Sequence, residues 1–131
     1  KWAEKIRNPK SVIDKLGVKP EHKVSLWKLT DPALRADLAA RCTDLSDKLR
    51  KDSDVIFAYI EDGETLAELS RLETYIKPNG MIWVIWPKGR KGFNGDHVFA
   101  AAKDQSLSGI KVCSVSEALS AVKVVIPAAR R

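Results

Sequence analysis

Two uninterrupted apolar runs, at residues 55–60 and 81–86, dominate the hydrophobic pattern of the chain. Each run has the length of one β-strand, and a strand that is apolar at every position is typical of a sheet covered on both faces. Between them, leucines recur at steps of three and four over residues 64–76, which predicts a helix ending at the Lys-Pro-Asn-Gly turn of residues 77–80. Two buried strands joined through a helix imply a parallel pair with a right-handed crossover.

The pattern on either side of this unit predicts further strands and helices. Residues 23–29 alternate polar and apolar side chains and predict the first strand. A helix is expected at residues 30–41, which open on Thr-Asp-Pro, and another at residues 96–105. Residues 110–115 and 121–126 alternate around a five-residue link, which predicts an antiparallel hairpin.

Two shorter segments complete the predicted fold. Residues 43–52 fit either a helix or a short edge strand. Residues 8–17 begin with Asn-Pro and end on a glycine, so we expect a short helix that packs on the core as a lid. The predicted fold class is α/β: a three-layer, Rossmann-like sheet, mainly parallel, with a C-terminal antiparallel hairpin. A length of 131 residues allows one domain, with the helical lid at residues 1–19 and the α/β core at residues 20–131.

Charge is distributed unevenly along the chain. The 23 Lys and Arg exceed the 17 Asp and Glu by six, yet residues 24–76 hold eleven acidic and only seven basic residues. A basic protein attracts polyanions, but the interleaved aromatic residues of a dedicated nucleic-acid binder are missing, so nucleic-acid binding is our third hypothesis. No apolar run is long enough to span a membrane, and we expect a cytoplasmic protein without a membrane partner. Cys42 and Cys113 have no metal-binding spacing and are expected to be free thiols.

Candidate ligand-binding residues follow the carboxyl ends of the predicted strands, where open parallel sheets bind ligands. Lys88, Arg90 and Lys91 lie in a glycine-rich loop before a helix, a combination that suits a phosphate, sulfate or carboxylate. The alternative is an ordinary basic loop. Trp86, at the exit of the preceding strand, is expected to line a pocket.

Two acidic residues follow the first of the apolar runs. Either Glu61 or Asp62 could pair with Lys88 across the neighbouring strand end; the alternative is a hydrophilic turn. His22 and His97 are isolated, and no catalytic or metal-binding motif is present. We therefore predict neither a metal site nor a catalytic residue.

The segment from Asp54 to Val84 resembles the second half of class I S-adenosylmethionine-dependent methyltransferases, in which a strand, a helix, a KPxG turn and another strand occur in this order. Nearly the whole chain also resembles a family of small bacterial proteins classified as a domain of unknown function. The matching pieces are residues 15–20, 54–60, 80–88, Asp96, 109–115 and Lys123. The resemblance implies a truncated, methyltransferase-like Rossmann fold with no established activity. The family pattern has Trp and Gly in the last hairpin where this chain has Leu119 and Ala121.

Two features that the methyltransferase resemblance implies are missing from the sequence. The loop after the first strand should be rich in glycine so that the backbone can approach the cofactor, but residues 29–34 contain none. An acid that could bind the ribose at the end of a second strand is not identifiable. We therefore expect no cofactor, and in particular no S-adenosylmethionine bound in the usual mode.

These observations leave two main hypotheses about function. The leading one is a non-catalytic Rossmann-like binding or interaction module, not an enzyme, whose basic loop holds an anionic small molecule or a protein partner. The alternative is a divergent S-adenosylmethionine-dependent methyltransferase, in which Asp31, Glu61 and Asp62 contact cofactor or substrate.

Overall fold

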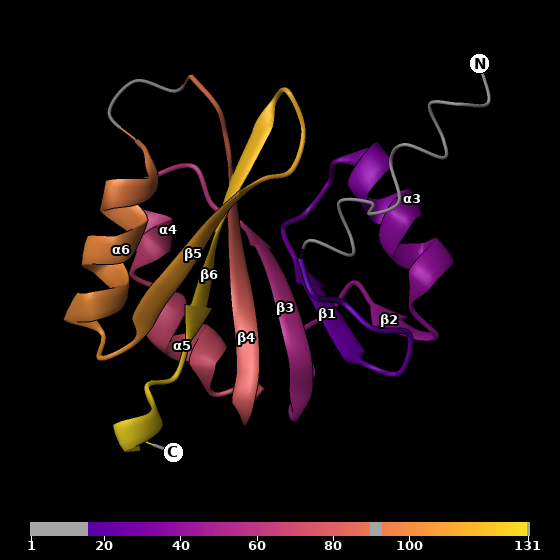
Figure 1. Ribbon diagram of the computed structural model, residues 1–131, viewed down its shortest axis with the longest axis horizontal. Helices are drawn as coiled ribbons and strands as arrows, with labels where there is room; N and C mark the ends of the chain where they lie inside the picture. The colour runs from indigo at the N-terminus through magenta and orange to yellow at the C-terminus, as the bar shows by residue number, and fades with distance from the viewer. Residues whose placement is uncertain (1–15, 90–92, 131) are drawn as a thin grey trace.

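One mixed sheet organises the molecule, as the computed structural model shows for residues 16–89 and 93–130 (Figure 1). The described residues form a six-stranded sheet of order β2-β1-β3-β4-β6-β5. Its strands are β1 (Lys23–Trp27), β2 (Asp44–Ser46), β3 (Ser53–Tyr59), β4 (Ile76–Pro87), β5 (Ser108–Ser114) and β6 (Leu119–Val125). β1 to β4 pair in parallel, and β6 lies antiparallel between β4 and β5. The predicted mainly parallel sheet with a C-terminal antiparallel hairpin is confirmed.

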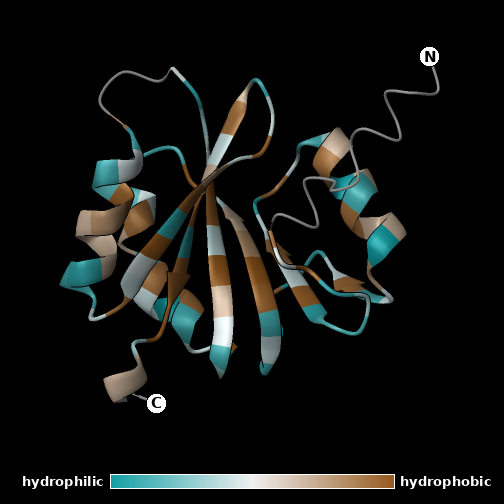
Figure 2. Cartoon of the chain, in the orientation of Figure 1, coloured by the Kyte–Doolittle hydropathy of each residue, from teal (hydrophilic) through white to brown (hydrophobic). Residues whose placement is uncertain are grey.

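Helices cover both faces of this sheet. In Figure 1, α3 (Pro32–Arg41) lies on one side, and α4 (Gly63–Leu66), α5 (Leu69–Glu73) and α6 (Gly95–Asp104) lie on the other. A short 3-10 helix, η1 (Ala128–Arg130), follows the last strand. Neighbouring residues of β3 enter opposite cores: Phe57 joins the cluster that contains Leu38 of α3, and Ile56 joins the cluster that contains Leu69 of α5. The central strands are accordingly brown over much of their length in Figure 2, and the three-layer prediction is confirmed.

Most predicted elements occur within a few residues of their expected bounds. The first strand, the α3 helix, the α6 helix and the hairpin are all present. Residues 43–52 contain a strand, since β2 pairs in parallel with β1, and this settles the alternative in favour of the edge strand. The predicted lid helix, residues 8–17, lies outside the described residues except for its last two positions. One of these, Leu16, packs into the α3-side core together with Val18. Both cysteines are free and buried, as predicted, and burial raises the pKa of Cys42.

The helix predicted at residues 64–76 is wrong in length. Two short helices, α4 and α5, replace it, and β4 already begins at Ile76, which pairs with Ser53. Residues 77–80 therefore belong to an irregular strand, and the register between β3 and β4 shifts at this point. Gly80 suits the irregularity because a Cβ there would lie 3.0–3.1 Å from three backbone carbonyl oxygens. Strand pairing at these positions thus overrides the local signals for a helix end.

Candidate functional site

The carboxyl ends of the parallel strands meet at one edge of the sheet, where open α/β sheets bind ligands. Trp27 ends β1, Ser46 ends β2, Tyr59 ends β3 and Pro87 ends β4. The residues that follow these four ends form the candidate site. We call this region the carboxyl edge.

A cavity of about 620 Å³ opens at the end of β1. We call it the β1 cavity, and it is lined by Trp27, Lys28, Glu64, Thr65, Glu68 and Arg71. Its volume falls in the range of small-molecule sites, which is about 300–1,000 Å³. Its walls combine one indole, two cations and two carboxylates.

The indole of Trp27 is the main apolar surface in the β1 cavity. The ammonium of Lys28 lies 5.2 Å from the indole centroid, and the guanidinium carbon of Arg71 lies 5.8 Å from it. Arg71 also bonds to the Glu68 carboxylate at 2.7 Å, and this bond raises the pKa of the guanidinium. These cation–π contacts are weak where solvent reaches them, so a ligand ring could displace them at small cost.

Lys28 has a backbone conformation that is unusual for a residue with a side chain. Its φ is +60°, in the left-handed region that glycine occupies most readily. The loop after β1 therefore turns through the left-handed region at Lys28, although residues 28–34 contain no glycine. This conformation costs an ordinary residue about 1–2 kcal/mol.

An acid does follow the second strand, although it was not identifiable in the sequence. Asp47 comes directly after β2, and its side chain is 65% exposed. One carboxylate oxygen accepts a bond of 2.6 Å from Arg35, whose other terminal nitrogen donates to the Leu29 carbonyl at 2.8 Å. Arg35 thereby links the loop after β1 to the acid after β2. The pairing of β2 with β1 identifies Asp47 as the residue that follows the second strand. A strand of three residues has too short a hydrophobic pattern to be recognised in the sequence.

Asp31 and Asp62 cap helices at the carboxyl edge. Asp31 is the N-cap of α3 and accepts from the backbone N–H of Leu34 at 2.9 Å. Asp62 is the N-cap of α4 and accepts from the backbone N–H of Thr65 at 2.7 Å. Glu61 precedes Asp62 in the connection from β3 to α4. Glu61 and Asp62 directly precede α4, whose Glu64 and Thr65 line the β1 cavity, whereas Asp31 lines a separate small cavity with Asp37 and Ser116.

The basic residues predicted after β4 are described only in part. Lys88 donates from its ammonium to the Ser114 hydroxyl at 2.6 Å, and from its backbone N–H to the Ala118 carbonyl at 2.8 Å. Both contacts tie Lys88 to the C-terminal hairpin. Arg90 and Lys91 lie outside the described residues, so the three-cation anion site stays a prediction.

Trp86 belongs to the core. It is 5% exposed and packs edge-to-face on Phe93, with ring centroids 6.0 Å apart. Trp83, three residues earlier on the strand, joins the opposite core and donates its indole N–H to the Leu16 carbonyl at 3.0 Å. Phe93 and Gly95 lie against the Trp86 indole, and the expectation that Trp86 lines a ligand pocket stays a prediction.

Neither a metal-binding cluster nor a membrane-spanning helix occurs in the described part of the chain. Within residues 16–89 and 93–130, no group of three or more His, Cys, Asp or Glu is placed to hold a metal ion. Over the same residues, no helix combines the length and the apolar character that crossing a membrane requires.

The fold has clear relatives among solved structures, although no protein-family model matches the sequence and no curated protein is significantly similar to it. A candidate methyltransferase from Thermoplasma acidophilum matches 86% of this chain and 71% of its own, with a TM-score of 0.61 and 8% identity. An S-adenosylmethionine-dependent methyltransferase from Aquifex aeolicus matches over 88% of each chain, with a TM-score of 0.56 and 15% identity. A TehB-like S-adenosylmethionine-dependent methyltransferase from Corynebacterium glutamicum matches over 96% of each chain, with a TM-score of 0.51 and 13% identity. The fold is that of the Rossmann-like methyltransferases.

These matches correct our leading hypothesis about function. A non-catalytic binding module was our first choice, but the matched proteins from Aquifex aeolicus and Corynebacterium glutamicum are S-adenosylmethionine-dependent methyltransferases, which favours the alternative. The predicted methyltransferase-like core is confirmed. The resemblance to the small bacterial family, and the truncation that it implies, stay predictions.

Proposed function

We propose that the chain binds S-adenosylmethionine at the carboxyl edge and acts as a divergent methyltransferase. The observation that carries the proposal is the β1 cavity, which opens at the ligand-binding edge of a methyltransferase fold. Identity to the matched proteins is low, so the likeness supports the fold, and the argument for the ligand comes from this chain's own residues.

Asp47 weakens one of the two objections that the sequence raised. A ribose diol presents two hydroxyl donors, and a carboxylate that keeps acceptor capacity suits them. Asp47 uses one oxygen for Arg35 and remains 65% exposed. We infer that Asp47 would accept from the ribose hydroxyls.

Lys28 bears on the second objection, the absence of glycine after β1. The backbone adopts the left-handed turn at Lys28 without a glycine, and the cofactor would be contacted there by a side chain in place of bare backbone. The Lys28 side chain lies over the Trp27 indole and lines the β1 cavity. We infer that Trp27 would stack on the adenine, while Lys28 would meet the cofactor's carboxylate.

The acids at the carboxyl edge match the remaining charges of the cofactor. S-adenosylmethionine carries a sulfonium, an ammonium and a carboxylate, and when bound it supplies an electrophilic methyl group. Glu64 and Glu68 line the same cavity and would face its cationic groups. The chain's part in the reaction is to hold and orient the donor, and orientation of reactants is a large source of rate enhancement.

Calorimetric titration of the whole chain with S-adenosylmethionine tests this proposal. We expect a micromolar Kd that weakens by about tenfold or more in Asp47→Asn, since a charged hydrogen-bond acceptor is lost. Trp27→Leu should weaken binding to a similar degree. Asp52→Asn is the matched control, because Asp52 is exposed, lies at the opposite edge before β3, and has a left-handed φ of +61° that Asn tolerates. Absence of binding to the wild-type chain, or equal binding by the Asp47 and Asp52 variants, would contradict the proposal.

A further inference from the structure

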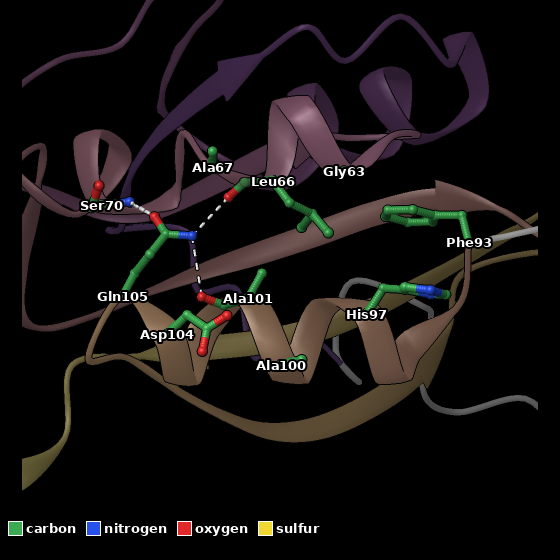
Figure 3. A pocket seen from close by; sticks show the side chains of 10 residues that line it. All are labelled: Gly63, Leu66, Ala67, Ser70, Phe93, His97, Ala100, Ala101, Asp104 and Gln105. Atoms are coloured by element: carbon green, nitrogen blue, oxygen red, sulfur yellow. Dashed lines mark hydrogen bonds between the residues drawn. The ribbon is translucent and has the colours of Figure 1, made fainter.

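A second cavity lies on the other side of α4 from the β1 cavity. It occupies the space between α4–α5 and α6 and has a volume of about 500 Å³ (Figure 3). We call it the interhelical cavity. Gly63, Leu66, Ala67 and Ser70 form one wall, and six residues from Phe93 to Gln105 form the other. None of these residues is part of the site proposed for S-adenosylmethionine.

Small side chains create the interhelical cavity. Ala67 lines one wall, and Ala100 and Ala101 line the other, so the helices leave a gap that larger residues would fill. A Cβ added at Gly63 would have no heavy atom within 4 Å, which shows how open this end is. The gap lies over well-packed residues, since Leu66 is 3% exposed and Phe93 is 5% exposed.

Hydrogen bonds from one side chain fix the two walls relative to each other. The Gln105 amide donates to the carbonyls of Leu66 and Ala101 at 3.0 and 3.1 Å, and its oxygen accepts from the Ser70 N–H at 2.6 Å. Figure 3 shows these three bonds closing one end of the cavity. The amide spans both walls, so the cavity is pre-formed, as small-molecule sites usually are.

The two ends of the interhelical cavity differ in chemistry. At one end the exposed His97 ring stacks on the nearly buried Phe93 ring, with centroids 5.8 Å apart and planes 9° apart, and both rings line the cavity. At the other end lies the Asp104 carboxylate, to which no cation is paired within the described part of the chain. Asp104 is the last residue of α6, where the helix dipole disfavours a negative charge. A cationic group placed there would relieve this repulsion.

The spacing of the two ends sets the length of a ligand. His97 and Asp104 are seven residues apart on α6, which corresponds to about 10 Å along the helix axis. We propose that the interhelical cavity binds a small aromatic amine, with its ring against Phe93 and His97 and its ammonium at Asp104. This site goes beyond the proposed methyltransferase function and does not depend on it.

Fluorescence titration with dansylcadaverine tests the proposal. This probe joins an aromatic group to a primary amine through a five-carbon chain, and its emission rises and shifts to the blue in an apolar site. We expect saturable, micromolar binding to the wild-type chain. Its N-acetyl derivative, which lacks the charge, should bind about tenfold more weakly, and Asp104→Asn should remove this difference. Asp37→Asn on α3 is the matched charge control and should preserve it.

Blocking variants locate the binding. Ala67→Phe and Ala100→Phe place a ring in the cavity from opposite walls, and both positions are exposed enough to tolerate the change. Each should abolish the fluorescence change, whereas Ala36→Phe on the exposed face of α3 should leave it intact. Thermal unfolding of each variant checks that it is folded. The proposal is overturned if the wild-type chain does not bind the probe, if both blocking variants bind it normally, or if the acetylated probe binds equally well.

Discussion

Asp54 ties three strands together at the edge opposite the candidate site. One carboxylate oxygen accepts from the Lys23 backbone N–H at 2.8 Å, and the other pairs with the Lys77 ammonium at 3.2 Å. Burial by itself would raise the pKa of Asp54, but the Lys23 hydrogen bond and the Lys77 charge outweigh it and lower the pKa below its ordinary value. The ionised form of Asp54 therefore stabilises the folded chain.

This shift predicts a pH dependence of stability. A carboxyl whose pKa is lower in the folded state contributes stability above its unfolded pKa, and loses it as the pH falls through the folded pKa. Asp54→Asn should reduce the free energy of unfolding by about 1 kcal/mol at pH 7, and the difference from wild type should shrink below about pH 4. Urea denaturation of the wild-type and variant chains between pH 7 and pH 3 measures this difference in the free energy of unfolding. Asp52→Asn removes the same charge without these contacts, so a similar loss there would refute the assignment to Asp54.

Caps and strand pairing explain the elements at the carboxyl edge. The sequence predicted α3, α6 and the hairpin because Asp31-Pro32, the loop before α6 and the alternation after residue 108 are local signals. It left residues 43–52 open between a helix and an edge strand, because β2 is a strand of three residues that is defined by its pairing with β1. Asp47, the acid after that strand, was missed for the same reason. The residues of the β1 cavity come from β1, α4 and α5, and only the fold brings them together.

The N-cap role of Asp31 separates helix stability from ligand binding. Asp31 is among the residues that the sequence predicts to contact a cofactor, and in the structure it accepts from the Leu34 N–H at the start of α3. Asp31→Ala should lower the free energy of unfolding by about 1 kcal/mol, the usual effect of losing a cap. It should leave the Kd for S-adenosylmethionine within about twofold, because Asp31 does not line the β1 cavity. Loss of a hydrogen bond to the cofactor would change the Kd by more than this. A large loss of affinity with unchanged stability would restore Asp31 to the binding site.

At the scale of the whole molecule, the distribution of charge fits a cationic ligand at the carboxyl edge. The chain has a net charge of +6, but residues 24–76 are acidic. These residues contribute Asp47, Glu64 and Glu68 to the edge, and S-adenosylmethionine carries a net positive charge. The overall basic character is thus a poor guide to the ligand, since the candidate site lies in the acidic part of the sequence.

The ends of β1 and β2 are the proposed binding site for an adenosyl cofactor. A crystal structure of the chain soaked with S-adenosylhomocysteine, the product form of the cofactor, tests it most directly. We expect electron density along the carboxyl edge, with the adenine on Trp27 in the β1 cavity and the ribose hydroxyls on Asp47, which follows β2. Full occupancy of the ligand at another place, or an empty carboxyl edge at millimolar ligand, would contradict it.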